Sequence, residues 1–208
     1  MHQTRAQVSK KIPLPRKGSK YVARSLMDLK NSIPVVIAVR DMLQLARTAK
    51  EVKKMIIKKS LRINGKEVKD YRDSIRLFNL LDADKSYILT FNLQGKFVLE
   101  ETKQKDRPCK VIGKKLLPGK KIQLNLHDGT NVLTNNSKIR TNDTVYLDES
   151  QKIKEHLELG PGKDCMIIKG KFLGRKARIN KILNDKVSVN IQELNFETTL
   201  DKEGVIII

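Results

Sequence analysis

Four lysines in the first third of the chain are spaced so that they would share one face of a helix. Lys50, Lys53, Lys54 and Lys58 fall at spacings of three and four residues, and such positions are neighbours on a helix surface. Like charges held this closely repel one another, and acidic residues do not alternate with them. A polyanion lying across the face would relieve the repulsion. The spacing therefore favours a phosphate-binding surface over an ordinary solvated helix face.

The sequence around these lysines predicts two short helices and a tight hairpin over residues 34–68. Pro34 is typical of the opening turn of a helix, and apolar residues recur at helical spacing after it. Thr48 and Glu51 match a capping box that would begin the second helix. Asn64 and Gly65 would supply the positive φ angles of a two-residue hairpin turn.

Residue patterns that would support catalysis or metal binding are absent from the sequence. Cys109 and Cys165 lie far apart, without a Cys-x-x-Cys pair or clustered histidines, so we expect reduced cysteines in the core and no zinc site. His127 precedes Asp128, but the Asp-Gly dipeptide is better explained by a turn, because no nucleophile or second acid is near in sequence. We therefore expect no enzymatic activity, no cofactor and no small-molecule substrate.

The composition points to an anionic partner. The 208 residues carry a net charge of +20, with a pI near 10, which is typical of proteins that bind nucleic acid or an acidic surface. No apolar run approaches the ~18 residues of a membrane span, and the N-terminus lacks the core of a secretory signal. Aromatic residues make up only 4%, which favours recognition of the backbone and shape of RNA over base stacking. We expect a cytoplasmic protein.

The first 27 residues contain no acidic residue. Pro13 and Pro15 forbid a helix through their middle. A segment of this composition is expected to be disordered alone and to become ordered on phosphate contact. Its basic residues are Arg5, Lys10, Lys11, Arg16, Lys17, Lys20 and Arg24.

The remaining two thirds of the chain have mainly the period of β-strands. Residues 87–99 predict a hairpin around Gln94 and Gly95, and Cys109 begins a further β stretch. Residues 120–126 alternate cleanly, which would place Ile122, Leu124 and Leu126 in the core. Further strand candidates follow between residues 145 and 159, and Gly160-Pro-Gly162 predicts a boundary.

Beyond that boundary, a strand, Gly170-x-x-x-Gly174 and a second strand resemble the KOW motif of ribosomal and transcription-elongation proteins, which sits in a small SH3-like barrel. The resemblance implies a loop whose glycines let the backbone approach RNA and whose basic residues meet phosphates. Ala177 stands where the motif usually has a third glycine. The apolar C-terminus predicts a closing strand. The basic residues of this region are Lys169, Lys171, Arg175, Lys176 and Arg178.

Two longer resemblances cover most of the chain. Arg47-Thr-Ala-Lys-Glu51 followed by Leu61-Arg-Ile-Asn-Gly-Lys66 resembles the small RNA-binding module named for bacterial ribosomal protein S-four. The order of basic arm, this module, a β region containing Gln123-Leu-Asn-Leu-His-Asp-Gly129 and a KOW-like barrel resembles the small-subunit ribosomal protein S-four-e family of archaea and eukaryotes. That family implies a structural, rRNA-binding component without catalysis. The chain departs from the family before Ser32, where it starts late and has Ser25-Leu-Met-Asp-Leu29 in place of a Pro- and Gly-rich segment.

Together these observations predict an α+β, mostly β protein with a helical RNA-binding module, a central β domain and a C-terminal SH3-like barrel. The expected divisions are a basic arm over 1–30, the module with its following hairpin over 31–100, the central domain over 101–160 and the barrel over 161–208.

The expected partners are small-subunit rRNA and neighbouring small-subunit proteins, in the ribosome and not at a membrane, and the composition resembles archaeal proteins. An RNA-modifying enzyme, or a KOW-type transcription factor or RNA chaperone, remains the alternative. The predicted RNA-binding residues are Arg16, Lys17, Lys20, Arg40, Arg47, Lys50, Lys53, Lys54, Lys58, Lys59, Arg62, Lys66, Lys169, Lys171, Arg175 and Lys176.

Overall fold

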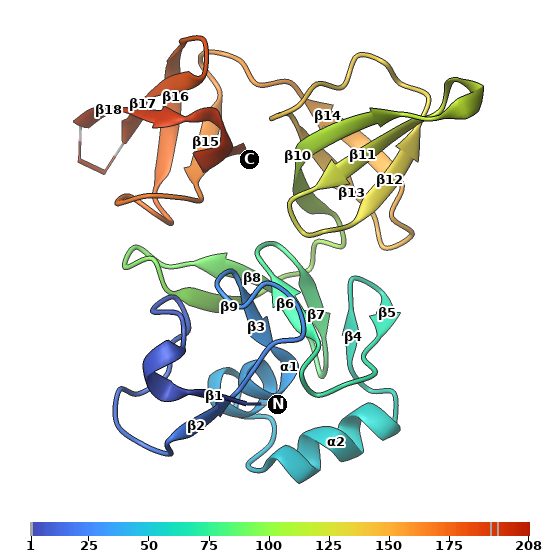
Figure 1. Ribbon diagram of the computed structural model, residues 1–208, viewed down its shortest axis with the longest axis vertical. Coiled ribbons are helices and arrows are strands. Elements are labelled where there is room, and N and C mark those ends of the chain that lie inside the picture. Colours follow the sequence, from blue (N-terminus) through green and yellow to red (C-terminus); the bar gives the residue numbers. More distant parts are fainter. Residues whose placement is uncertain (1, 192, 195) are drawn as a thin grey trace. The chain divides into compact units, whose positions relative to one another are not determined.

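Short strands make up most of the regular secondary structure of the protein, as a computed structural model that describes residues 2–191, 193–194 and 196–208 shows (Figure 1). The chain divides into two compact units, Met1–Lys105 and Asp106–Ile208. The mostly β, α+β fold predicted from the sequence is confirmed. Among the described residues, no helix combines the length and the apolar content needed to cross a membrane.

The N-terminal segment is folded, so the prediction that it is disordered on its own is wrong. Strand β1 (His2–Thr4) pairs antiparallel with β2 (Tyr21–Ala23), and a 3-10 turn, η1 (Arg5–Gln7), follows β1. Ile12 is buried, and the Lys11 carbonyl accepts a hydrogen bond from the Phe97 amide at 2.8 Å. The Arg5 guanidinium donates to the carbonyls of Ser19 and Pro15 at 2.9 and 2.5 Å. A few buried apolar contacts and one arginine therefore order a segment whose charge alone suggested disorder.

The first predicted helix is shorter than its apolar pattern suggested. Pro34 ends strand β3 (Ser32–Pro34), which pairs with β6 (Ser74–Arg76), and has extended backbone angles as the residue that caps the helix. One turn, α1 (Val35–Ile37), then widens into a π-helical turn, η2 (Ala38–Met42). All residues from Val35 to Val39 are buried. Because this segment is buried on every side, packing decides its shape more than helical periodicity does.

The second helix and the hairpin agree with their predicted signals. Helix α2 (Ala49–Ile57) begins after Thr48, whose hydroxyl accepts from the Glu51 amide while the Glu51 carboxylate accepts from the Thr48 amide. In Figure 1, α2 leads directly into the hairpin of β4 (Arg62–Ile63) and β5 (Lys66–Glu67). Asn64 and Gly65 have φ angles of 50° and 77°, as a two-residue hairpin turn requires.

The hairpin belongs to a five-stranded antiparallel sheet in the order β5-β4-β7-β8-β9. Its other strands are β7 (Leu80–Asp82), β8 (Ser86–Phe91) and β9 (Phe97–Glu101). Phe91 faces Phe97 across the β8–β9 register, and their ring centroids are 4.7 Å apart. The predicted hairpin around Gln94 and Gly95 is confirmed.

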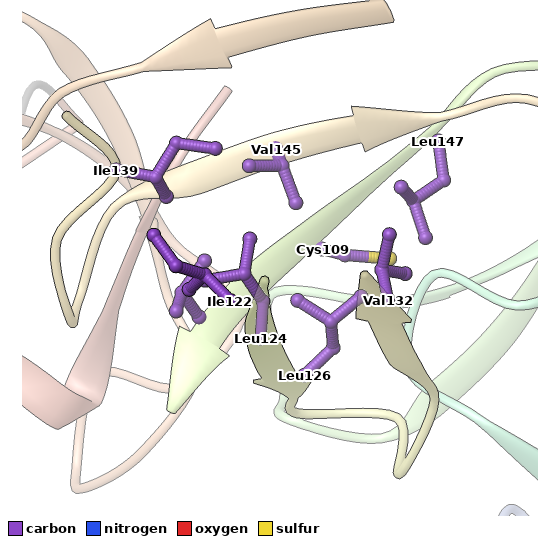
Figure 2. Packing of buried hydrophobic residues seen from close by; sticks show 9 residues of the cluster. Cys109, Ile122, Leu124, Leu126, Val132, Ile139, Val145 and Leu147 are labelled. Atoms are coloured by element: carbon purple, nitrogen blue, oxygen red, sulfur yellow. The ribbon is translucent and has the colours of Figure 1, made fainter. Parts of the chain in front are cut away.

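The second unit contains two five-stranded sheets, each with its own core. The first has the order β12-β11-β10-β13-β14, built from β10 (Arg107–Leu116), β11 (Ile122–Leu126), β12 (Asn131–Thr134), β13 (Thr144–Leu147) and β14 (Ile153–Leu157), with a 3-10 turn η3 (Pro118–Lys120) before β11. Figure 2 shows the predicted inward residues Ile122, Leu124 and Leu126 pointing toward Cys109 and Val145. The long strand β10 pairs first with β13 and then with β11, so one strand joins both halves of the sheet.

The second sheet has the order β18-β17-β16-β15-β19 and is consistent with an SH3-like half-barrel. Its elements are β15 (Asp164–Ile167), β16 (Lys176–Ile182), β17 (Lys186–Ile191), β18 (Phe196–Asp201), the 3-10 turn η4 (Lys202–Gly204) and β19 (Val205–Ile207). The predicted closing strand is β19, which pairs with β15. Ala177 is buried in this core, so a small side chain fits where the KOW motif usually has glycine.

Candidate nucleic-acid interface

The lysine face predicted on α2 is present and open to solvent. Val52 is fully buried and anchors the helix on the first unit, which leaves Lys50, Lys53, Lys54 and Lys58 exposed on the other side. None of these four lysines forms a salt bridge with any residue that the structure describes. Their charges are therefore available to an external anion.

Three contacts around Tyr71 restrict one lysine of this face. The Lys53 ammonium lies 4.7 Å from the centroid of the Tyr71 ring, which also carries the Arg72 guanidinium at 5.5 Å. Arg72 in turn forms a salt bridge with Asp70 at 2.8 Å, and hydrogen bonds from Arg72 lower the pKa of the Asp70 carboxyl. Cation–π contact restricts where the Lys53 side chain can go. One of the four lysines is thus held in place before any ligand arrives.

The end of α2 is fixed by backbone hydrogen bonds. The Ser60 amide donates to the Met55 carbonyl at 3.1 Å and the Lys59 amide to the Ile56 carbonyl at 2.9 Å, the pattern of a Schellman motif. Lys59 has the left-handed φ of 56° that usually calls for glycine. Its ammonium forms an exposed salt bridge with Glu67 at 3.1 Å. Arg62 and Lys66 lie exposed on the following hairpin.

The start of the module contributes less free charge than predicted. Arg40 forms two hydrogen bonds to the Asp41 carboxylate, at 2.9 and 2.8 Å, and these bonds raise the pKa of the guanidinium. Arg47 is exposed, and its backbone amide donates to Glu51 at 2.7 Å. That bond is the main reason why the pKa of the Glu51 carboxyl is lowered. Arg47 is therefore a better candidate for RNA contact than Arg40.

The predicted residues of the N-terminal segment lie in the loop between η1 and β2. Arg16, Lys17 and Lys20 are all exposed there. The Lys20 ammonium lies 5.5 Å from the centroid of the Tyr21 ring. Because Arg5 closes the base of this loop, the three cations belong to a loop of the folded first unit.

Of the predicted cations in the KOW-like loop, two form salt bridges with carboxylates and two form none with the described residues. Lys169 forms a salt bridge with Glu203 at 2.8 Å, and Arg175 forms one with Glu193 at 3.0 Å. Lys171 lies 5.9 Å from the Phe172 ring centroid, and Lys176 is exposed at the start of β16. Gly170 and Gly174 have positive φ angles of 93° and 87°, so both glycines are required by the conformation of the loop. The strand–loop–strand pattern predicted from the sequence is confirmed.

A buried ion pair in the second unit was not predicted. The turn at His127–Gly129 is confirmed, but Asp128 pairs with Arg107, and both side chains are 1% exposed. Thr130 donates to the Asp128 carboxylate from its amide at 2.9 Å and its hydroxyl at 2.8 Å. Burial alone would raise the pKa of this carboxyl, but the Arg107 charge and the Thr130 hydrogen bonds outweigh it, so the pKa is lowered. Asp128 is a structural carboxylate.

Lys110 is a second buried cation that sequence reasoning missed. It is 2% exposed, and its ammonium donates to the carbonyls of Lys202 and Val205, the latter at 2.5 Å. Burial, reinforced by the charge of Lys169, lowers the pKa of Lys110 to about 7. These bonds connect β10 with the η4–β19 segment of the second sheet.

The two cysteines are buried and unpaired, as expected of core residues. Cys109 and Cys165 lie in the separate cores of the second unit, and burial raises the pKa of each thiol to about 12. Across the described ranges, histidine, cysteine and carboxylate side chains do not gather in a group of three that could hold a metal ion.

Sequence and structure comparisons agree on one family. A family model described as "Ribosomal family S4e", the S-four-e family considered above, matches residues 83–153. The small ribosomal subunit protein eS4 of Methanocella arvoryzae is 30% identical over 95% of this chain and 90% of its own length. The eS4 protein of Archaeoglobus fulgidus is 34% identical over 86% and 79%.

A solved structure extends the similarity to the fold. The crystal structure of the 30S ribosomal protein S4e from Thermoplasma acidophilum superposes with a TM-score of 0.73 and 25% sequence identity. The match covers 86% of this chain and 95% of that one. Because the similarity extends over most of both chains in sequence and in structure, the protein belongs to the ribosomal family S4e.

Proposed function

We propose that the protein is a structural constituent of the small ribosomal subunit and binds its rRNA. Family membership supports this role, since the curated relatives are small-subunit proteins and the family is a class of structural ribosomal proteins. The single observation that carries the binding surface is the exposed face of α2, where lysines without salt bridges are concentrated. The other partners would be neighbouring small-subunit proteins, and the location would be the ribosome.

The proposed contact surface gives most weight to cations that form no salt bridge within the described part of the chain. On this basis Arg40, Lys59, Lys169 and Arg175 are secondary contacts, because each already forms a salt bridge in the described structure. The primary contacts proposed are Arg16, Lys17, Lys20, Arg47, Lys50, Lys53, Lys54, Lys58, Arg62, Lys66, Lys171 and Lys176.

We also propose that the second unit acts as two β modules. Each of its sheets has a separate hydrophobic core, and the segment around Gly160–Gly162 connects them. The module boundaries near residues 30, 100 and 160 would then divide the chain into an N-terminal segment, a helical module, a central β module and a C-terminal barrel. Separate basic surfaces on such modules would let one chain contact several parts of an rRNA.

Binding to small-subunit rRNA at increasing salt tests the electrostatic mechanism. Roughly 6–10 phosphate contacts would lower affinity by about 10³–10⁵ between 50 and 200 mM salt. The double change Lys54→Glu with Lys58→Glu should weaken binding and make it less dependent on salt. The matched control is Lys96→Glu with Lys103→Glu, which makes the same charge change at exposed positions outside the proposed surface. Equal losses in both variants, or a flat salt titration, would contradict the proposed surface.

A further inference from the structure

An apolar side chain lies in the middle of the lysine face. Ile57, the last residue of α2, is 79% exposed. It follows Lys50 by seven residues, Lys53 by four and Lys54 by three, which are the spacings of residues on one helix face. The core-facing side of the helix is formed instead by Val52, with Met55 and Ile56 half-buried. Ile57 therefore points outward among the cations.

Hydrogen bonds close the helix end that carries Ile57. The two Schellman hydrogen bonds satisfy the carbonyls of Met55 and Ile56, and the Ser60 hydroxyl also donates to the Met55 carbonyl at 3.0 Å. The neighbouring Lys53 is held over the Tyr71 ring. These hydrogen bonds satisfy carbonyls at the end of the helix and so favour the helical conformation up to Ile57. Ile57 is thus presented on a capped turn of the helix, between the lysines.

A surface that met only phosphates would be served better by a polar residue at this position. A β-branched side chain is a weaker helix former than Lys, Gln or Glu, and the exposed apolar area of Ile57 remains in contact with water. The ridge of phosphates along a continuous RNA duplex offers no apolar partner, because its bases are stacked inside. An unpaired nucleotide does offer one, since its base can turn outward and expose an apolar face beside the phosphates.

We propose that Ile57 packs against the face of an unstacked base while the surrounding lysines hold the adjacent phosphates. The α2 face then binds RNA that carries an unpaired nucleotide more tightly than a continuous duplex. The lysines supply affinity regardless of sequence, and Ile57 supplies the preference for irregular RNA. This inference rests on the proposed function, because it assigns a selectivity to the same surface.

Two RNA hairpins of about 16 base pairs, identical except for one bulged adenosine, test this selectivity with the full-length protein. The wild-type protein should bind the bulged hairpin about fivefold more tightly, a modest effect for one base–side-chain contact. Ile57→Gln keeps a similar size and suits a helix, so it should remove the preference and leave affinity for the continuous duplex unchanged. Ile57→Met retains an apolar side chain and should keep the preference.

Two further variants separate this inference from the proposed function. Lys54→Gln should lower affinity for both hairpins by the same factor, because it removes a phosphate contact and not the base contact. Leu133→Gln, at an apolar position that is 59% exposed in the second unit, should leave both affinities unchanged. If Lys54→Gln has no effect on either hairpin, the RNA-binding surface itself is wrong.

Three results would contradict the inference about Ile57. Equal wild-type affinity for the two hairpins would overturn it while leaving phosphate binding by the lysines intact. A preference that survives Ile57→Gln would place the base contact elsewhere. If Ile57→Gln leaves RNA binding unchanged but lowers retention in the small subunit, Ile57 contacts a neighbouring protein and the inference is also wrong.

Discussion

Lys110 and Arg107 are buried in the same unit, but their charges are compensated differently. Arg107 faces the Asp128 carboxylate, whereas the described residues give Lys110 two backbone carbonyls as hydrogen-bond acceptors and no carboxylate. A neutral amine has two N–H donors, so it can keep both of these bonds without a buried charge. This arrangement is consistent with the pKa of about 7 for Lys110.

The lowered pKa of Lys110 predicts that stability rises with pH above neutrality. In the unfolded chain a lysine has a pKa near 10.4, so between about 7 and 10 the unfolded state binds more protons than the folded state. The free energy of unfolding should therefore rise by about 1 kcal/mol between pH 7 and pH 8. Urea denaturation followed by circular dichroism at constant ionic strength measures this slope. The control Lys110→Met should remove it, and an unchanged slope in that variant would exclude Lys110 as the cause.

Removing the partner of Arg107 should destabilise the second unit strongly. Asp128→Asn leaves a buried guanidinium without its counter-charge, which typically costs about 3–5 kcal/mol. Asp106→Asn is the matched control, because Asp106 also pairs with a cation, Lys154, at 2.7 Å, but both side chains are more than one third exposed. The control should change stability by less than about 1 kcal/mol. Similar losses in the two variants, measured by thermal or urea unfolding, would show that the buried pair has no special role.

The local sequence predicted the turn at Asp128 but not the buried partners of Asp128 and Lys110. The Asp128-Gly129 turn follows from residue types alone, and the structure contains it. The partner Arg107 lies 21 residues earlier, so pairing depends on how β10 and β11 align, which no local pattern specifies. The hydrogen bonds of Lys110 could not be predicted from local sequence either, because its acceptors Lys202 and Val205 are more than 90 residues away.

At the scale of elements, α2 combines a well-formed start with a strained end. The capping box at Thr48 and Glu51 satisfies the first amides of the helix. At the other end, Lys59 occupies the left-handed conformation in which a residue other than glycine is disfavoured by roughly 1–2 kcal/mol. A lysine at this position adds positive charge beside the proposed RNA surface, at a cost in stability.

Lys59→Gly should therefore stabilise the first unit. We expect the free energy of unfolding to rise by about 1 kcal/mol, since glycine adopts this conformation without strain and the exposed Glu67 salt bridge contributes little. Affinity for RNA should fall modestly because one charge is lost. Lys58→Gly is the control: Lys58 has an ordinary φ of −73°, so the same charge loss should lower stability by about 0.5 kcal/mol. Chemical denaturation of both variants measures their free energies of unfolding. A loss of stability in both would contradict the strain at Lys59.

The elements that the sequence predicted well are those set by short-range chemistry. The capping box, the Asn64-Gly65 turn and the alternation of Ile122, Leu124 and Leu126 each depend on residues within one element or turn. The errors arose where distant packing decides. The segment at Val35–Val39 is buried, and the chain widens into a π-turn over Ala38–Met42. The N-terminal strands pair with each other despite their charge, because Ile12 and Val22 find a buried site.

At the scale of the whole molecule, positive charge is distributed over two units that each have a compact fold. The candidate cations occur on the N-terminal loop and the helical module of the first unit and on the KOW-like loop of the second. The family similarity extends across both units. A net charge of +20 on 208 residues suits a protein whose partner is a large polyanion. The sequence predicted this general distribution, whereas the division of cations into paired and unpaired ones required the structure.

Sedimentation of a lysate from the native organism through a sucrose gradient, with detection of this chain, tests the central claim most directly. As a structural constituent, the protein should migrate with the small ribosomal subunit and remain there after washing in moderately high salt, because many dispersed phosphate and protein contacts would have to break together. Protein that stays at the top of the gradient, or that migrates with RNA polymerase, would contradict the account.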